Sequence, residues 1–166
     1  WTLHPGLYQT LHFAANRIAM PWTAVTYPFA SVGDGRNIVW FAFTLLWIWW
    51  TGSVIERDMG SGRFAAFWVA MSVLPALAFT FFYVLGVGTR PLFELWLPEA
   101  ALTVAWATRY PNAVVRLIVF PVEAKWVGAL AAAGVLFGFG TPIPLLGVAA
   151  CLHLALAWAI ASNRIP

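Results

Sequence analysis

The feature that most constrains this chain is a long run without any formally charged residue near its end. Residues 126–163 contain no Asp, Glu, Lys or Arg. At about 1.5 Å per helical residue, this run is nearly twice as long as one crossing of about 30 Å of hydrocarbon requires. The glycines and prolines of residues 138–144 divide it, because they favour a turn. The run therefore predicts two membrane-spanning helices joined by a short turn.

Further apolar runs precede it, and the composition agrees with a membrane protein. Apolar residues make up 62% of the 166-residue chain and charged residues 9%, with a mean hydropathy of +0.81, whereas soluble domains average about 45–50% apolar and about 25% charged. A water-soluble globule is therefore excluded, and we expect a single all-α transmembrane domain over residues 1–166. Its five expected spans lie at residues 38–55, 64–86, 96–108, 124–140 and 143–162. Residues 1–37, interrupted by prolines and charges, are expected to form an interfacial loop segment.

The basic residues beside these spans predict the orientation of the chain. One side of the expected bundle holds Arg57, Arg63, Arg109, Arg116, Lys125 and Arg164, and the other holds Arg17, Arg36 and Arg90. Because cytoplasmic loops carry the excess of Lys and Arg, we expect a cytoplasmic C-terminus, in a bacterial inner (cytoplasmic) membrane. The formal charge of +3 comes without a basic run, which indicates no nucleic-acid partner.

Small residues recur at four-residue spacing in the last two expected spans. They are Gly134 and Gly138, followed by Gly147, Cys151, Ala155 and Ala159. Such stripes let helices approach closely where the hydrophobic effect no longer drives association. We therefore expect helix packing inside the bundle, with a dimerisation face as the alternative. On this stripe Cys151 is interpreted as a small packing residue and not as a nucleophile.

Three local patterns resemble one family, in order and spacing along nearly the whole chain. They are PWTAVTYPF at 21–29, GSVIE at 52–56 followed by GSGRF at 60–64, and YPN at 110–112 followed by FPVEAKW at 120–126. These stretches resemble rhomboid intramembrane proteases at the end of the long first loop, at the junction of the second and third spans, and at the entry to the fifth span. The resemblance implies a rhomboid-like helical bundle of six spans, of which the first would lie upstream of this chain.

The catalytic pattern of that family is not matched. Rhomboid proteases resemble one another in a Gly-x-Ser-Gly motif at the start of the fourth span, and the matching residues 94–97 read ELWL. Trp96 thus stands in place of the serine. Trp40 and Thr44 stand in place of a His-x-x-x-Asn pattern that helps to hold the oxyanion. Since only His153 matches the catalytic pair, the resemblance implies an inactive member, a pseudoprotease.

An ionisable residue inside a membrane span is by default a candidate for function. The family's glycines three and seven residues after the histidine are Leu156 and Ile160 here, so we expect a less close approach to the fourth span. We interpret His153 as a neutral imidazole hydrogen-bonded within the bundle, and a ligand for haem or a chlorophyll-type pigment is the alternative. No metal site or other cofactor is expected, and His4 and His12 are interpreted as water-facing headgroup contacts.

Tryptophans crowd the span expected at 38–55. Trp40, Trp47, Trp49 and Trp50 lie there, and Trp96 begins a later span. Aromatic side chains favour membrane interfaces, so we interpret this set as lipid anchors, and a flat surface against a partner helix, lipid tail or pigment is the alternative. Plugging of the former active site by Trp96 would favour a permanent structural role.

Two acidic residues near the start of the 96–108 span are interpreted without catalysis. Glu94 and Glu99 are expected at the rim of an extramembrane loop, because a carboxylate pair needs a cleft and fixed geometry to act as acid and base. Glu56 is interpreted as part of a charged cap at the end of the preceding span. The sequence therefore predicts a protein that is not an enzyme.

These observations favour a membrane protein that binds the transmembrane helices of other proteins. We expect a structural accessory subunit, or scaffold, of a larger membrane complex of respiratory or photosynthetic type. The first alternative is a client-binding pseudoprotease that regulates the stability or trafficking of membrane proteins. The second is a serine-type intramembrane protease with an unrecognised nucleophile. A transporter or channel is the least favoured, because the spans offer almost no polar path.

Overall fold

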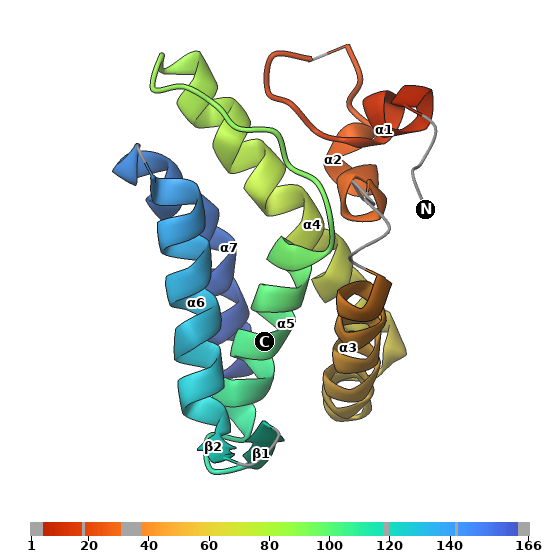
Figure 1. Ribbon diagram of the computed structural model, residues 1–166, viewed down its shortest axis with the longest axis vertical. Helices are drawn as coiled ribbons and strands as arrows, with labels where there is room; N and C mark the ends of the chain where they lie inside the picture. The colour runs from red at the N-terminus through yellow and green to blue at the C-terminus, as the bar shows by residue number, and fades with distance from the viewer. Residues whose placement is uncertain (1–4, 18, 31–37, 118–119, 142, 163–166) are drawn as a thin grey trace.

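The computed structural model describes residues 5–17, 19–30, 38–117, 120–141 and 143–162 (Figure 1). The elements are α1 (Pro5–Leu11), α2 (Thr23–Thr26), η1 (Tyr27–Phe29), α3 (Ile38–Met59), α4 (Ser61–Val84), α5 (Trp96–Arg109), β1 (Val114–Leu117), β2 (Phe120–Glu123), α6 (Ala124–Gly140) and α7 (Pro144–Ala161). The protein is mostly helical, because in lipid a helix satisfies all of its backbone hydrogen bonds within one segment.

Each expected span coincides with one helix, and the ends differ by a few residues. The helix α3 continues past residue 55 to Met59, since the charged residues at its end face water rather than ending the helix. Its successor α4 begins at Ser61, three residues earlier than expected. Between them Gly60 has a φ of 81°, a left-handed conformation that glycine adopts without steric cost. A single glycine therefore separates the two helices.

Three of the described helices are long and apolar enough to cross a membrane. They are Val39–Met59, Ser61–Val84 and Pro144–Ala161. The helix α6 is apolar but has 17 residues. The helix α5 has 14 residues, which corresponds to about 21 Å at about 1.5 Å per residue. This is less than the hydrocarbon thickness of about 30 Å, so α5 by itself is too short to cross a membrane.

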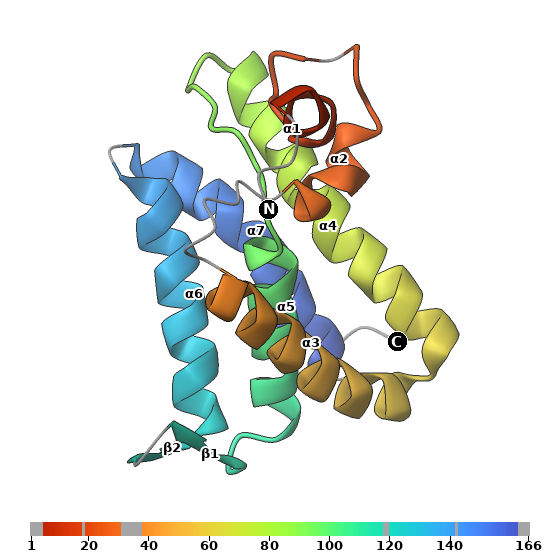
Figure 2. The ribbon, with the colours of Figure 1, turned by 45° about the vertical axis from the view of Figure 1, so that its right-hand side comes forward.

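The short helix α5 lies at the centre of the bundle. It packs against α3, α4, α6 and α7 (Figures 1 and 2). Nine of its 14 residues are buried: Leu97, Pro98, Ala100, Ala101, Leu102, Thr103, Ala105, Trp106 and Ala107. The outer helices instead expose large apolar side chains, as Leu46 of α3, Leu77 of α4 and Phe137 of α6 do. The fold therefore has a core around α5 and an apolar outer surface suited to lipid.

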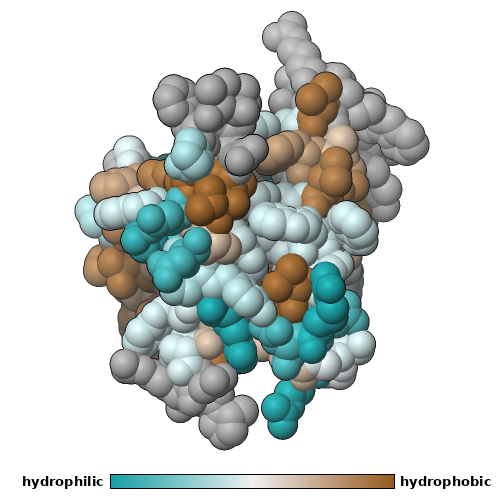
Figure 3. Space-filling model, turned by 90° about the horizontal axis from the view of Figure 1, so that it is seen from below, coloured by the Kyte–Doolittle hydropathy of each residue, from teal (hydrophilic) through white to brown (hydrophobic). Residues whose placement is uncertain are grey.

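One end of the bundle collects the polar connections. The hydroxyl of Tyr110, which follows α5, donates a hydrogen bond of 2.7 Å to Asp58 at the end of α3. The antiparallel hairpin of β1 and β2 lies at the same end, and Lys125 forms an ion pair with Glu123 there. Figure 3 shows this end, where hydrophilic side chains gather between apolar ones. We refer to it below as the hairpin end.

The N-terminal segment lies at the opposite end and is bonded to the loop before α5. Phe13 and Leu92 exchange backbone hydrogen bonds of 3.0 and 2.8 Å. In this segment the interpretation of His12 as water-facing is wrong. Its ring is 7% exposed, stacks on Tyr8 with ring centroids 4.6 Å apart, and its Nδ1 lies 2.8 Å from the Tyr8 carbonyl oxygen. His4 lies outside the described residues.

Candidate functional site

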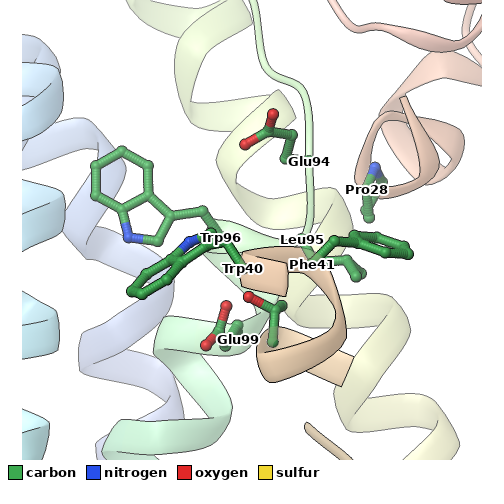
Figure 4. Close-up of a pocket in the computed structure, with 8 residues that line it drawn as sticks. Pro28, Trp40, Phe41, Glu94, Leu95, Trp96 and Glu99 are labelled. Atoms are coloured by element: carbon green, nitrogen blue, oxygen red, sulfur yellow. The ribbon is translucent and has the colours of Figure 1, made fainter. Parts of the chain in front are cut away.

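A pocket of about 540 Å³ opens at the N-terminal end of α5 (Figure 4). Its lining comes from η1, from the first turns of α3, and from the loop before α5 with the start of that helix: Pro28, Trp40, Phe41, Thr44, Glu94, Leu95, Trp96 and Glu99. Trp96, Trp40 and Thr44, which the sequence comparison singled out separately, thus surround one pocket. The carboxyl groups of Glu94 and Glu99 join them, although the sequence predicted no site that contains both.

Backbone contacts hold the two carboxyl groups at the pocket. Glu94 has a φ of 66°, which is unusual for a residue with a side chain, and its N–H donates to the carbonyl of Ala30 at 3.1 Å. Burial raises the pKa of the Glu94 carboxyl above its ordinary range. Glu99 does not lie in an extramembrane loop, as expected, but in the first turn of α5. In the part of the chain that the structure describes, neither carboxylate has a hydrogen-bond or ion-pair partner.

Thr44 is the polar side chain that lines the pocket from α3. It is 8% exposed, and its hydroxyl forms no hydrogen bond with any described residue. Hydroxyls in an apolar helix usually donate to the carbonyl four residues earlier. The other serines and threonines inside α3, α4 and α5 do so: Thr51, Ser53, Ser72, Thr80, Thr103 and Thr108. The Thr44 hydroxyl therefore remains available to a ligand.

Trp96 does not plug this pocket. Its indole stacks on Phe139 of α6, with ring centroids 5.3 Å apart and planes at 24°. A Cβ atom added to Gly138 would lie 2.3 Å from the indole, so the glycine makes room for the ring. Figure 4 shows the indole turned away from Phe41 and Pro28. The ring forms one wall of the pocket, is 41% exposed, and leaves the space beside the carboxylates open.

His153 is held by the backbone of α5 and not by a nucleophile. Its side chain is 1% exposed, and Nε2 lies 3.0 Å from the carbonyl oxygen of Leu97. Because a carbonyl oxygen can only accept, Nε2 is assigned the proton. No serine, threonine or cysteine of the described residues is hydrogen-bonded to this ring. The geometry thus supplies a structural link between α7 and the first turn of α5.

The expectation that α7 would stand away from the fourth span is wrong. The hydrogen bond from His153 to Leu97 requires direct contact between the two helices. Small residues on both helices allow this contact, because Ala100, Ala101 and Ala157 are all buried in the core. The larger side chain of Leu156 instead lines a shallow apolar groove beside α4. Alanines therefore provide the close packing between α5 and α7.

The tryptophans of α3 divide into two groups. Trp47 is half-buried and packs toward α5: its indole N–H donates to the Thr103 hydroxyl at 2.9 Å and its ring packs edge-on against Trp106. Trp50 also contacts Trp106, with ring centroids 5.2 Å apart. Trp40 and Trp49 are 70% and 69% exposed. Only the exposed pair is free to meet lipid or a partner over most of its surface.

The small-residue stripe meets different neighbours along its length. A Cβ atom on Gly147 would lie 2.3 Å from the carbonyl oxygen of Leu136 and 2.8 Å from the Cα of Gly140, so α6 and α7 are in backbone contact there. Gly134 faces Trp96, at 3.9 Å from the position of an added Cβ. The structure places Cys151 with its Sγ 3.9 Å from the Ala132 carbonyl oxygen of α6.

Further along α7 the small residues pack less tightly against α6. Ala155 is exposed beside a groove that α6 residues also line, and Ala159 is half-buried. The stripe therefore makes close helix contacts at its start and is more exposed further on.

Of the residues described, no group of three or more His, Cys, Asp and Glu is arranged to hold a metal ion.

Arg90 has a role that sequence reasoning missed. Its guanidinium donates to the carbonyl oxygen of Gly138 at 2.9 Å and to that of Thr141. These carbonyls lie at the C-terminal end of α6, where intrahelical donors are lacking and a cation is favourable. The sequence signal is an arginine in the short loop before a span, where Glu94 is the other charged residue. The contact fixes the loop before α5, and hence the pocket, against α6.

The fold and the site define a helical protein with three described helices able to cross a membrane and a carboxylate-bearing pocket at one end of its central helix. No protein-family model, no curated protein and no solved structure matches this chain.

Proposed function

We propose that this chain is a non-catalytic, rhomboid-like membrane protein that binds transmembrane helices of partner proteins, as a structural accessory subunit of a larger membrane complex. The observation that carries the proposal is the exposed outer face of α3 beside the pocket. Eight large apolar side chains of this helix are exposed: Val39, Trp40, Phe41, Phe43, Leu45, Leu46, Trp49 and Trp50. Among the described elements, α4 and α5 are the ones that pack substantially against α3, and the eight exposed side chains are available to another helix.

The surroundings of His153 support the absence of proteolysis. A serine protease needs its nucleophile within hydrogen-bond reach of the histidine. Here the ring bonds to the Leu97 carbonyl, and Trp96 occupies the position of the family's serine. A serine-reactive fluorophosphonate probe should therefore leave the purified protein unlabelled. Labelling that disappears in a His153→Ala variant would contradict the proposal.

The open pocket favours a second candidate function. Trp96 packs against α6 and does not fill the pocket, so a plugged site no longer favours a permanent subunit. A client-binding factor that takes up membrane proteins reversibly would use such an open site. The two candidate functions differ in stoichiometry, which one experiment measures.

The test is purification from the native membrane through a tag in mild detergent, followed by quantitative mass spectrometry. A fixed set of proteins at constant ratio supports the accessory subunit, and many substoichiometric membrane proteins support the client-binding factor. A Trp49→Ala variant should lower partner recovery. Trp126→Ala, at a 60% exposed position on α6, is the matched control. Isolation of the chain alone from the native membrane would contradict both functions.

We also propose that the hairpin end faces the cytoplasm of a bacterial inner membrane. The hydrogen bond from Tyr110 to Asp58 brings together the two loops that hold most of the basic residues, and cytoplasmic loops carry such an excess. A reporter that fluoresces only in the cytoplasm, fused to the C-terminus, should be bright. A dark fusion that is active with a periplasmic reporter would reverse the orientation.

A further inference from the structure

The pocket at the N-terminal end of α5 carries more polar chemistry than apolar helix packing requires. Glu94 and Glu99 both line it, and neither carboxylate has a hydrogen-bond or ion-pair partner among the described residues. An unpaired carboxylate in an apolar protein is costly, and such residues usually pair or mark a functional site. Among the described lining residues there is no lysine, arginine or histidine. These residues therefore bring two carboxyl groups and no basic group to the pocket.

An independent feature of α3 points to the same space. The Thr44 side chain is more than nine-tenths buried, lines the pocket and lacks the backbone hydrogen bond that the other hydroxyls of these helices form. Its oxygen is accessible from the pocket and can accept a hydrogen bond. A ligand that donates such a bond would use an acceptor that no described residue occupies. Glu94, Glu99 and Thr44 thus present acceptor oxygens to the same pocket, where one ligand with several N–H donors could reach them.

The aromatic walls suit a cation. Trp40 and Trp96 line the pocket together on one side (Figure 4), and Trp40 is 70% exposed. The face of an indole attracts an ammonium or guanidinium group within about 6 Å of its centroid, and the attraction strengthens away from water. Carboxylates and a hydroxyl accept the N–H donors of the same group. Together, the two carboxyl groups, the hydroxyl and the indole faces favour binding of a cationic nitrogen group over a neutral or anionic one.

We propose that this pocket binds the ammonium or guanidinium group of a basic side chain that a partner's transmembrane helix carries near the end opposite to the hairpin. This inference rests on the proposed function, since it names the group by which the partner is recognised. The exposed apolar face of α3 begins at the pocket with Trp40 and Phe41. A helix lying along α3 would therefore place a lysine or arginine near its end into the site.

The test uses the purified full chain in phosphatidylglycerol bilayers, which contain no amine. The probe is a dansyl-labelled Leu/Ala helix of about 20 residues, long enough to span the bilayer, with one lysine near one end. Energy transfer from the tryptophans of the protein to dansyl reports binding. A peptide with glutamine in place of the lysine is the matched control. The lysine peptide should bind about tenfold more tightly than the glutamine peptide, or better.

Substitutions in the protein test whether the preference for the lysine peptide arises in this pocket. The double substitution Glu94→Gln with Glu99→Gln should remove it while leaving the binding of the glutamine peptide unchanged. Thr44→Val should reduce it. Glu56→Gln, a change at the hairpin end of α3, should preserve it. Phosphatidylethanolamine carries the same ammonium group on a lipid, and adding it should leave the preference intact.

Four results would overturn the inference. These are equal affinity of the two peptides for the unmodified protein, absence of binding by both, a preference that survives the double substitution, and a preference that phosphatidylethanolamine abolishes. The last would assign the pocket to a lipid headgroup. None of them decides the proposed function, because the native partner is measured separately by co-purification.

Discussion

Substitution of Gly147 by alanine gives the sharpest test of the packing between α6 and α7. The added methyl group would lie 2.3 Å from the Leu136 carbonyl oxygen and 2.8 Å from the Gly140 Cα. Both are backbone atoms and cannot rotate away. Since carbon normally contacts oxygen at more than 3 Å, α7 must shift outward from α6, and overpacking of this kind costs about 1–3 kcal/mol.

A second glycine on the same helix pair separates this clash from helix propensity. At Gly134 an added Cβ atom meets nothing closer than 3.9 Å. Alanine in place of a helical glycine gains up to about 1 kcal/mol of propensity at either position. The difference between Gly147→Ala and Gly134→Ala therefore isolates the clash. We expect the first variant to be about 1–3 kcal/mol less stable than the second.

The free energy of unfolding in mixed micelles, measured by steric trapping or by titration with a denaturing detergent, provides the comparison. Equal stability of the two variants, or greater stability of Gly147→Ala, would refute the backbone contact between α6 and α7. Because both substitutions add the same methyl group to an apolar helix, a general effect of the mutation is controlled.

Three further outcomes follow from side-chain contacts. His153→Leu should cost about 1–3 kcal/mol of unfolding free energy, because the buried carbonyl of Leu97 loses its donor; a neutral result in the same micelle assay would contradict the helix link. Trp47→Phe should cost about 0.5–1.5 kcal/mol, because the indole N–H donates to a threonine of α5, whereas Trp49→Phe at an exposed position should be neutral; equal effects would reject the contrast. Burial raises the pKa of Glu94 in the folded state, so its protonation contributes stability that is present at low pH and lost as pH rises through the folded-state pKa. The loss of stability with rising pH should therefore be smaller in Glu94→Gln, and identical pH profiles would argue against it.

The positions of the long helices follow from the sequence alone, and three of the five expected spans are helices long and apolar enough to cross a membrane among the described residues. The run of residues 126–163 has no formal charge, and its glycines and prolines place the turn that separates α6 from α7. In lipid, backbone polar groups need partners within the segment, so an apolar run becomes a helix whatever surrounds it. This is why the expected bounds 124–140 agree with α6 and 143–162 with α7 to within one residue.

The site depended on packing that no sequence pattern showed. Trp47 and Trp49 are two residues apart on a helix that is apolar on every side, yet one bonds to α5 and the other faces outward. Neither hydropathy nor spacing distinguishes them, because the face of such a helix that turns inward is chosen by its neighbours. For the same reason the burial of His12 and the direction of the Trp96 ring were predicted wrongly.

The sequence by itself determined that the chain is helical and apolar enough for a membrane, and it located the five longest helices to within a few residues, since both depend on local composition and backbone bonding. The tertiary structure decided which side chains meet. Thr44 comes from α3, whereas Glu94 and Trp96 are neighbours at the start of α5, and only the packing of α3 against this segment brings them to one pocket. Contacts between residues distant in sequence depend on how whole helices fit together, and a uniformly apolar sequence leaves that choice to shape.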